Sequence, residues 1–228
     1  MKINFTDREL KILTNFSKIN ANILFKKDDE YFRTINTYQN IFAEFKTGRK
    51  FTKEFGITDL SEFLSYIDLF DEPQFEYKHT KGGIEIKDRN KHLFYPCADP
   101  KTLVFQRKLF IPKDYNPVAE FDFKSENFEM NKFLKTKHSP PDLVFFCENG
   151  EIKFQCLDKR NFYQTKFTIN LKQKTNRNFK IFLKAENLKI FESDYKVKLF
   201  KEKISEWENK HIPLKYYIAL EHGSEFAW

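Results

Sequence analysis

Residues 96–117 read PCADPKTLVFQRKLFIPKDYNP, and this stretch decides how the rest of the chain is organised. It contains prolines at four positions, and proline fixes the backbone φ angle and lacks the N–H that helices and central strands require. We therefore expect an extended connector here with a folded unit on either side. The predicted bounds are 1–103 for the first domain, 104–117 for the connector and 118–228 for the second domain.

Each flanking unit opens with a helix signal. Thr6, followed three residues later by Glu9, is typical of a capping box for a helix over residues 7–19. Ser125 is the expected cap of a corresponding helix over residues 126–137. The two predicted caps lie about 120 residues apart, which is the first sign of an internal duplication.

A β-hairpin and a second short helix are predicted after each opening helix. The hairpin turns are Asp28-Asp29 and Asn149-Gly150, and the latter pair is a strong type I′ signal. The second helices are expected to start at Asp59 and at Glu186, before further alternating strands. The expected hairpin strands are 23–27 with 30–35, and 143–148 with 151–157. Because the spacing stays near 120 residues throughout, the sequence predicts a duplicated α+β unit.

The opening helix of each unit is predicted to be amphipathic, with a basic outer face. At 100° per residue, Arg8, Lys11 and Lys18 fall on the side opposite the apolar residues. Lys132 and Lys135 take the equivalent place in the second unit. Cations at this density neutralise phosphates without reading bases, so they favour sequence-independent contact with DNA. A solvated lysine surface is the alternative interpretation.

The second helices differ in charge. The polar face of the first is acidic, with Asp59, Glu62 and Asp68, which does not fit a uniformly basic DNA-contacting surface. Lys184 and Lys189 flank the corresponding helix of the second unit and join the predicted DNA contacts.

Composition excludes several classes of function. The net charge of +7 favours a polyanionic partner, and the three cysteines form no CxxC pair. The five histidines show no metal-ligand spacing, so no metal or other cofactor is expected. No signal peptide or membrane-length apolar run occurs, which predicts a soluble intracellular protein. Phosphate-binding loops and nucleophile motifs are also missing, so we expect no enzyme.

One catalytic pattern requires a geometric test. Asp142 after a proline, with Glu151 and Lys153 further on, matches the spacing of a PD…ExK nuclease. Such enzymes bind Mg²⁺ between two carboxylates. The predicted turn at Asn149-Gly150 would place Asp142 opposite Leu157, about 20 Å from the level of Glu151 at ~3.3 Å per residue. The hairpin therefore argues against a shared metal.

Several segments together resemble the sliding clamps of T-even-type tailed bacteriophages. The most specific is residues 94–104, FYPCADPKTLV, which is similar to the segment leading from the first clamp domain into its connector. The resemblance runs the whole length with few gaps. The other segments that carry it are LTNFSKIN at 13–20, DLSEFL at 59–64, GIEI at 83–86, NL at 187–188, YK at 195–196 and YYIALE at 216–221.

The resemblance implies a non-catalytic clamp with two duplicated processivity-fold domains per subunit. Three subunits would close into a ring, with helices inside and antiparallel sheets outside. Such a ring encircles double-stranded DNA, is loaded by an ATP-dependent clamp loader and tethers the replicative DNA polymerase. It would act in the cytoplasm of an infected bacterium, away from membranes. The alternative is a monomeric, non-catalytic DNA-binding or interaction module with the same fold.

The resemblance also implies two protein-binding surfaces. Subunits are expected to join by strand pairing, and a partner peptide is expected in an apolar pocket near the connector and C-terminus. Ordinary core packing is the alternative for the pocket residues. The expected joining residues are His92, Phe94, Phe162, Gln164 and Lys166, and the expected pocket residues are Val104, Phe105, Leu109, Ile111, Ile218 and Leu220.

Overall fold

The computed structural model describes residues 1–103, 116–136, 140–161, 163 and 165–227. The chain divides into two compact units, Met1–Leu109 and Phe110–Trp228, each described by itself below. The division falls inside the segment expected to be the connector. Residues 104–115 lie outside the described part, so the bounds of that connector remain a prediction.

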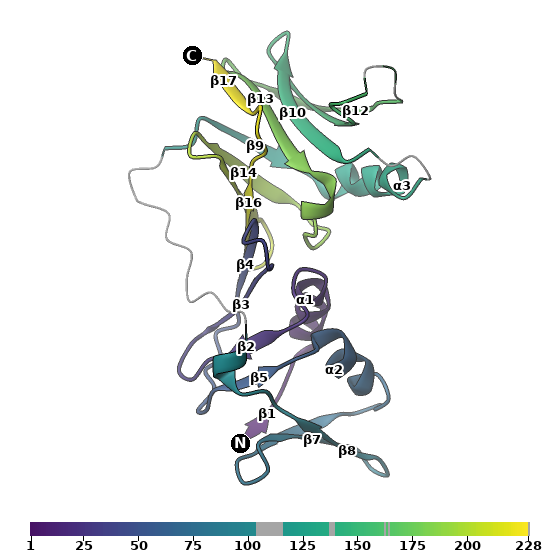
Figure 1. Cartoon of the computed structure of the whole chain (residues 1–228), viewed down its shortest axis with the longest axis vertical. Coiled ribbons are helices and arrows are strands. Elements are labelled where there is room, and N and C mark those ends of the chain that lie inside the picture. Colours follow the sequence, from purple (N-terminus) through teal and green to yellow (C-terminus); the bar gives the residue numbers. More distant parts are fainter. Residues whose placement is uncertain (104–115, 137–139, 162, 164, 228) are drawn as a thin grey trace. The chain divides into compact units, whose positions relative to one another are not determined.

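The first unit contains two helices and a four-stranded antiparallel sheet in the order β1-β6-β7-β8 (Figure 1). Two further antiparallel pairs join β2 to β5 and β3 to β4. Within the described residues, β8 is an edge strand of its sheet. The elements are β1 (Lys2–Ile3), α1 (Asp7–Ser17), β2 (Ile23–Phe25), β3 (Tyr31–Ile35), β4 (Ile41–Lys46), β5 (Phe55–Ile57), α2 (Leu60–Ile67), β6 (Gln74–Lys78), β7 (Gly83–Lys87), β8 (His92–Pro96) and the 3-10 turn η1 (Pro100–Thr102).

The predicted capping box of α1 is confirmed. The Thr6 hydroxyl accepts from the backbone N–H of Glu9 at 3.2 Å, and the Glu9 carboxylate accepts from the N–H of Thr6 at 2.7 Å. These bonds satisfy donors that helix geometry leaves without partners. Ile12, Leu13 and Phe16 are completely buried and fix the orientation of the helix.

The predicted hairpin of residues 23–35 is wrong. Strand β2 pairs with β5 instead, and the N–H of Asp28 donates to the carbonyl of Phe51 at 2.9 Å. All three residues of β2 are buried, so the strand lies inside the first unit, where β5 is its backbone partner. Phe25 stacks on Phe55 across the observed pair. Asp29 binds Arg33 and the N–H of Tyr31, which shapes a local turn before β3.

The second unit is built on two antiparallel sheets. One has the order β12-β11-β10-β13-β17, with β12 and β17 at its edges, and the other strands lie in the order β16-β15-β14-β9. The elements are β9 (Ala119–Phe123), η2 (Ser125–Glu129), α3 (Met130–Leu134), β10 (Asp142–Glu148), β11 (Glu151–Leu157), β12 (Phe167–Lys174), β13 (Asn178–Lys184), η3 (Ala185–Asn187), β14 (Tyr195–Phe200), β15 (Ile204–Asn209), β16 (Leu214–Ala219) and β17 (Glu225–Ala227).

The hairpin of β10 and β11 confirms its predicted turn and register. Asn149 and Gly150 both have positive φ, at 53° and 76°, as a type I′ turn requires. Glu148 faces Glu151 across the turn, and the pairing continues to the far end of both strands.

The opening helix of the second unit differs from the prediction for residues 126–137. Residues 125–129 form a 3-10 turn, and α3 covers only Met130–Leu134. The tighter turn directs Phe128 into the core, where it contacts Phe123 and Tyr195. An α-helix would rotate that side chain away from the apolar face. Ser125 is not a side-chain cap, and the helix expected from Glu186 is reduced to η3.

Aromatic side chains fill the core of the second unit. Trp207 lies at its centre and packs against Phe123, Phe145 and Tyr195 with edge-type geometries. Its indole N–H donates to the Ser205 hydroxyl at 3.0 Å, so the buried polar atom is satisfied. Among the described residues no helix is long and apolar enough to cross a bilayer.

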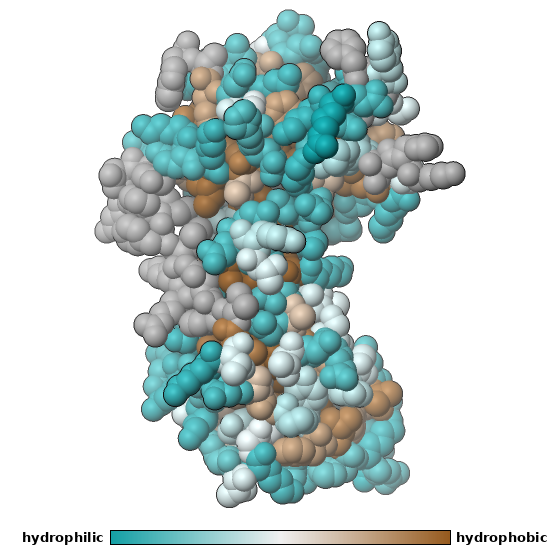
Figure 2. Space-filling model, viewed as in Figure 1, coloured by the Kyte–Doolittle hydropathy of each residue, from teal (hydrophilic) through white to brown (hydrophobic). Residues whose placement is uncertain are grey.

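Hydrophilic side chains cover most of the face shown in Figure 2. Apolar colour reaches the surface at the lower right of that view, in the region that α2 and β8 occupy in Figure 1. The large apolar side chains exposed in the first unit include Leu69, just after α2, and Phe94 of β8.

Candidate DNA-contact and subunit surfaces

Helix α1 presents an outer face that carries more cations than anions. Arg8, Lys11 and Lys18 are all exposed, and none forms an ion pair with the described residues. The carboxylate of Glu9 is absent from this face because it is buried and pairs with Arg49 at 3.0 Å. Asp7 is the remaining acidic residue of the helix. The three predicted DNA-contact residues therefore lie on one exposed basic face.

The second basic pair lies on α3. Lys132 and Lys135 are exposed and form no ion pair within the described part of the chain. Met130 is fully buried and anchors the helix, while the ring of Phe133 stacks on Phe167 of β12 with 5.4 Å between centroids. The lysines thus share one short segment that lies beside an edge strand.

A side chain from elsewhere in the second unit holds the start of this segment. The Asp194 carboxylate accepts from the backbone N–H of Ser125 at 2.7 Å and lies 2.9 Å from Nε2 of His211. The hydrogen bond from His211, followed by that from Ser125, lowers the pKa of Asp194 to about 2. One turn further on, the amide of Asn131 donates to Glu192 at 2.8 Å. Sequence reasoning missed this support, since Asp194 is distant in sequence from the helix that it caps.

Lys184 forms an ion pair with the neighbouring strand of its own sheet. The ammonium of Lys184 lies 2.7 Å from the carboxylate of Asp142, which is only 1% exposed. Asp142 also accepts from the backbone N–H of Lys159 at 3.1 Å. Lys184 therefore neutralises a buried charge, and this contact accounts for its position without DNA. Lys189 is exposed and follows η3.

The nuclease interpretation of the same region fails on the observed register. Asp142 faces Leu157 at one end of the hairpin, while Glu151 faces Glu148 at the other. No cluster of His, Cys, Asp and Glu suited to a metal occurs among the residues that the structure describes. Asp142 acts instead as the partner of Lys184.

The two strands predicted for subunit joining have comparable places in their sheets. Strand β8, which includes His92 and Phe94, and strand β12 are each at an edge, so each has a backbone face that its own sheet does not use. Lys166 is exposed and precedes β12 directly. Phe162 and Gln164 lie outside the described residues.

The ring of Phe94 lies against Gly83 on the neighbouring strand. A Cβ atom at residue 83 would come within 2.5 Å of the Phe94 Cζ atom and within 2.4 Å of the Tyr95 carbonyl oxygen. Lys81 approaches the same ring at 5.8 Å from its centroid. Glycine at position 83 is therefore needed for Phe94 to rest against the sheet, where it stays 37% exposed.

A group of cations surrounds Glu85 on the same sheet. Its carboxylate is within 4 Å of the ammonium groups of Lys87, Lys78 and Lys81 and of the His92 ring. The hydrogen bond from Lys87 is the main reason that the pKa of Glu85 falls to about 2. The signal in the sequence was an acid in a strand with lysines on either side, which the predictions did not use.

Two residues of the expected partner pocket are described. Ile218 is completely buried and Leu220 is 7% exposed, which agrees with the core-packing alternative, and the pocket itself stays a prediction. The other predicted pocket residues, Val104, Phe105, Leu109 and Ile111, lie outside the described part of the chain.

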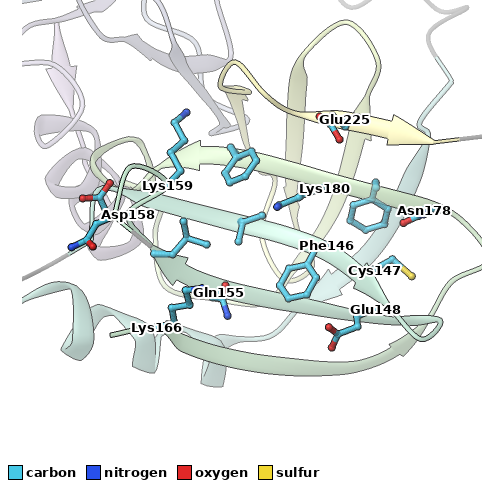
Figure 3. A pocket seen from close by; sticks show the side chains of 15 residues that line it. Phe146, Cys147, Glu148, Gln155, Asp158, Lys159, Lys166, Asn178, Lys180 and Glu225 are labelled. Carbon is cyan, nitrogen blue, oxygen red and sulfur yellow. The ribbon is translucent and has the colours of Figure 1, made fainter. Parts of the chain in front are cut away.

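A different groove of about 680 Å³ lies on the sheet of β10–β13 and β17 (Figure 3). Its floor includes Val144, Leu157 and Phe182, which are largely buried. Figure 3 shows Phe146, Lys180 and Glu225 extending from the neighbouring strands β10, β13 and β17. Lys159 and Lys180 lie over the ring of Phe182, both 5.4 Å from its centroid. The groove contains none of the predicted pocket residues.

Comparison with known proteins agrees with this fold. A family described as "gp45 sliding clamp, C terminal" matches residues 144–222. The chain is 27% identical over 225 residues to a sliding clamp of Vibrio phage KVP40, covering 97% of this chain and 99% of the relative. It is 25% identical to that of Escherichia phage RB69 and 24% to that of Enterobacteria phage T4, with coverage of 94% and 93% of this chain and 95% and 94% of those relatives.

Solved structures show the same architecture at lower identity. A PCNA2–PCNA3 complex from Sulfolobus tokodaii matches with a TM-score of 0.68 at 12% identity, covering 96% of this chain and 98% of the other. Proliferating cellular nuclear antigen from Entamoeba histolytica matches with a TM-score of 0.65 at 13% identity, covering 93% and 94%. These two structural similarities support the fold and nothing further. The three phage proteins carry the further resemblance: over nearly its whole length the chain is similar to the sliding clamps of T-even-type phages.

Proposed function

We propose that three copies of the chain close into a ring around duplex DNA and tether the replicative polymerase of a phage. Its place of action is the cytoplasm of the infected bacterium, where an ATP-dependent loader opens the ring. The exposed cationic face of α1 carries this proposal, because a ring that slides needs phosphate contacts that do not read sequence. Arg8, Lys11 and Lys18 make those contacts.

The subunit join is proposed between β8 of one copy and β12 of the next. Pairing of these edges satisfies backbone donors and acceptors on both strands and extends each sheet across the boundary. Phe94, resting on Gly83, supplies an apolar side chain next to this edge. The described residues that would meet the neighbouring copy are His92, Phe94 and Lys166.

Two measurements test the ring. Light scattering after size exclusion should give a mass near three subunits of 27.6 kDa. Protein loaded on closed circular DNA should stay bound, and linearising the circle should release it. A monomer throughout the micromolar range would favour the non-catalytic interaction module instead. Equal retention on linear and circular DNA would contradict topological binding.

A further inference from the structure

The C-terminal segment, residues 221–227, covers one edge of a sheet in the second unit. Strand β13 pairs with β10 on one side, and β17 covers its other side over three residue pairs. The cover extends further along β13, because the N–H of Phe182 donates to the Ser224 hydroxyl at 3.0 Å and the Phe182 carbonyl accepts from the N–H of Glu221 at 2.8 Å. The segment therefore occupies backbone groups that an open edge would offer to another strand.

A small number of contacts holds this segment in place. Strand β17 has three residues and lies at the edge of its sheet. The exposed turn before it contains Gly223 with a φ of 88°, a conformation that favours glycine, and the carbonyl of His222 accepts from the Lys159 ammonium group at 3.3 Å. Chain ends that are held by so short a ladder open at a small part of the free energy of global unfolding. The segment can therefore leave β13 while the rest of the unit stays folded.

The groove of Figure 3 lies next to the covered edge. Lys180 and Glu225 face each other in the pairing of β13 with β17, and both line the groove. Lys159 and Lys180 are exposed, lie over the ring of Phe182 and form no ion pair within the described part of the chain. The floor beneath them is apolar. A strand on β13 would thus place alternate side chains beside an apolar surface with two cations that can meet carboxylates.

We infer that the β13 edge and the groove beside it form a docking site for an extended segment of another protein, which displaces the C-terminal segment. The C-terminal segment itself shows the chemistry that the site accepts. Glu225 lines the groove, and Phe226 takes the alternate position opposite the buried Phe179. The incoming segment therefore carries a carboxylate followed by an aromatic side chain, and it adds to β13 as a strand. The site lies within the second unit, so it does not depend on the proposed ring.

The attached C-terminal segment should compete with any free one. A short linker holds the attached segment at an effective concentration of about 1 mM. A free peptide that binds the uncovered edge with a Kd of about 0.1 mM should therefore bind the intact chain roughly tenfold more weakly. Glu225→Lys should release the attached segment, because it places two lysines directly opposite each other across the β13–β17 pair.

The experiment measures the binding of a fluorescent peptide with the sequence of residues 221–227, EHGSEFA, by fluorescence anisotropy. The proteins are the full chain, its Glu225→Lys variant and a chain that ends at Leu220. Glu126→Lys, at an exposed position of η2, is the charge-matched control protein, and a peptide with Glu225→Lys and Phe226→Asp is the control ligand. Circular dichroism melts check that each protein is folded. Hydrogen exchange at the Phe182 amide reports whether the β13 edge is uncovered.

Binding to the shortened chain and to Glu225→Lys that is about tenfold tighter than to the full chain and Glu126→Lys supports the site. Equal binding to all four proteins, or equal binding of the control peptide, overturns it. Should the shortened chain not fold, Glu225→Lys decides: faster exchange at Phe182 without tighter peptide binding overturns the inference. A shortened chain that ignores the peptide and forms larger assemblies than the full chain would show that the edge takes a second copy, which overturns the choice of partner.

Discussion

The two units start from the same sequence pattern, yet their opening helices are held by different means. In the first unit, Thr6 and Glu9 cap a full helix from within the helix itself. In the second, no side chain of the segment itself caps the turn that starts at Ser125. The carboxylate of Asp194, in a loop distant in sequence, accepts from the backbone N–H of Ser125 instead. Duplication therefore preserves the place of a helix more strictly than the bonds that stabilise it. A local cap can be found in the sequence, whereas a cap from elsewhere in the fold cannot.

The largest expected difference between the two helices is in the aromatic side chains that pack them against the core. Phe16 is completely buried under α1, whereas Phe133 of α3 is only half-buried. Phe16→Ala should lower the free energy of unfolding of the first unit by about 3–5 kcal/mol, and Phe133→Ala that of the second unit by about 1–2 kcal/mol. Urea titration followed by circular dichroism measures both. Equal losses would show that the short helix is as deeply anchored as the long one.

The next difference is between a lysine that stabilises its unit and a lysine that lies on the surface. Lys184→Met should destabilise the second unit by about 2–3 kcal/mol, because it leaves the buried carboxylate of Asp142 without its cation. Lys11→Met on α1 should change the free energy of unfolding by less than about 0.5 kcal/mol. Thermal melts compare the two variants. A stable Lys184→Met protein with weakened DNA retention would restore the DNA role that the sequence predicted for this lysine.

Loss of the two caps is expected to have a smaller effect. Thr6→Ala and Asp194→Ala should each cost about 1 kcal/mol, one in each unit, because each removes the acceptor for a helix-terminal N–H. Hydrogen exchange resolves where the loss occurs. Faster exchange confined to α1 in the first variant, and to the segment of residues 125–134 in the second, is the expected pattern. Protection that falls evenly over both units would contradict independent capping.

Acid should weaken the cap at Ser125 by protonating the carboxylate of Asp194. The folded pKa of Asp194 is about 2, below the value near 3.9 of an unfolded chain. The contribution of Asp194 to the free energy of unfolding is therefore complete above about pH 4 and is lost as the pH falls through about 2. NMR titration of the Ser125 amide should follow this transition in the wild type. An amide shift in Asp194→Asn that follows the same acid transition would assign the change to another group.

The smallest expected effect is on the salt dependence of DNA binding. Lys11→Ala removes one phosphate contact per subunit and should reduce the slope of log K against log salt by about one for each. Lys201→Ala, at an exposed turn of the second unit, should leave the slope unchanged. Fluorescence anisotropy with short duplexes at several salt concentrations measures both. Equal slopes for the two variants would contradict a specific phosphate contact at Lys11.

Local signals in the sequence were sufficient for part of this structure. The capping box at Thr6 and the Asn149-Gly150 turn act through neighbouring residues, and both are confirmed. The predicted hairpin at Asp28-Asp29 failed because the partner of β2 is chosen by burial against β5, which is distant in sequence. The 3-10 turn around Phe128 likewise depends on the core that receives the ring.

The same distinction between local and long-range contacts applies to the candidate surfaces. Amphipathic periodicity predicted the exposed face of Arg8, Lys11 and Lys18, because a helix turns its side chains at a fixed angle. It gave no sign that Lys184 neutralises Asp142, since that contact crosses two strands. Burial of Ile218 and Leu220 depends on the packing of the second unit, so alternation along a strand did not distinguish core from pocket.

The two edge strands proposed for the join, β8 and β12, belong to different units, and this has a consequence for assembly. A copy that joins β8 to β12 of its neighbour uses two unlike surfaces, which makes the contact heterologous. Such a contact repeats head to tail until the rotation between successive copies closes a circle, and otherwise it grows into a helical filament. The rotation between successive copies, and not the strength of each contact, therefore sets the number of copies in a closed ring.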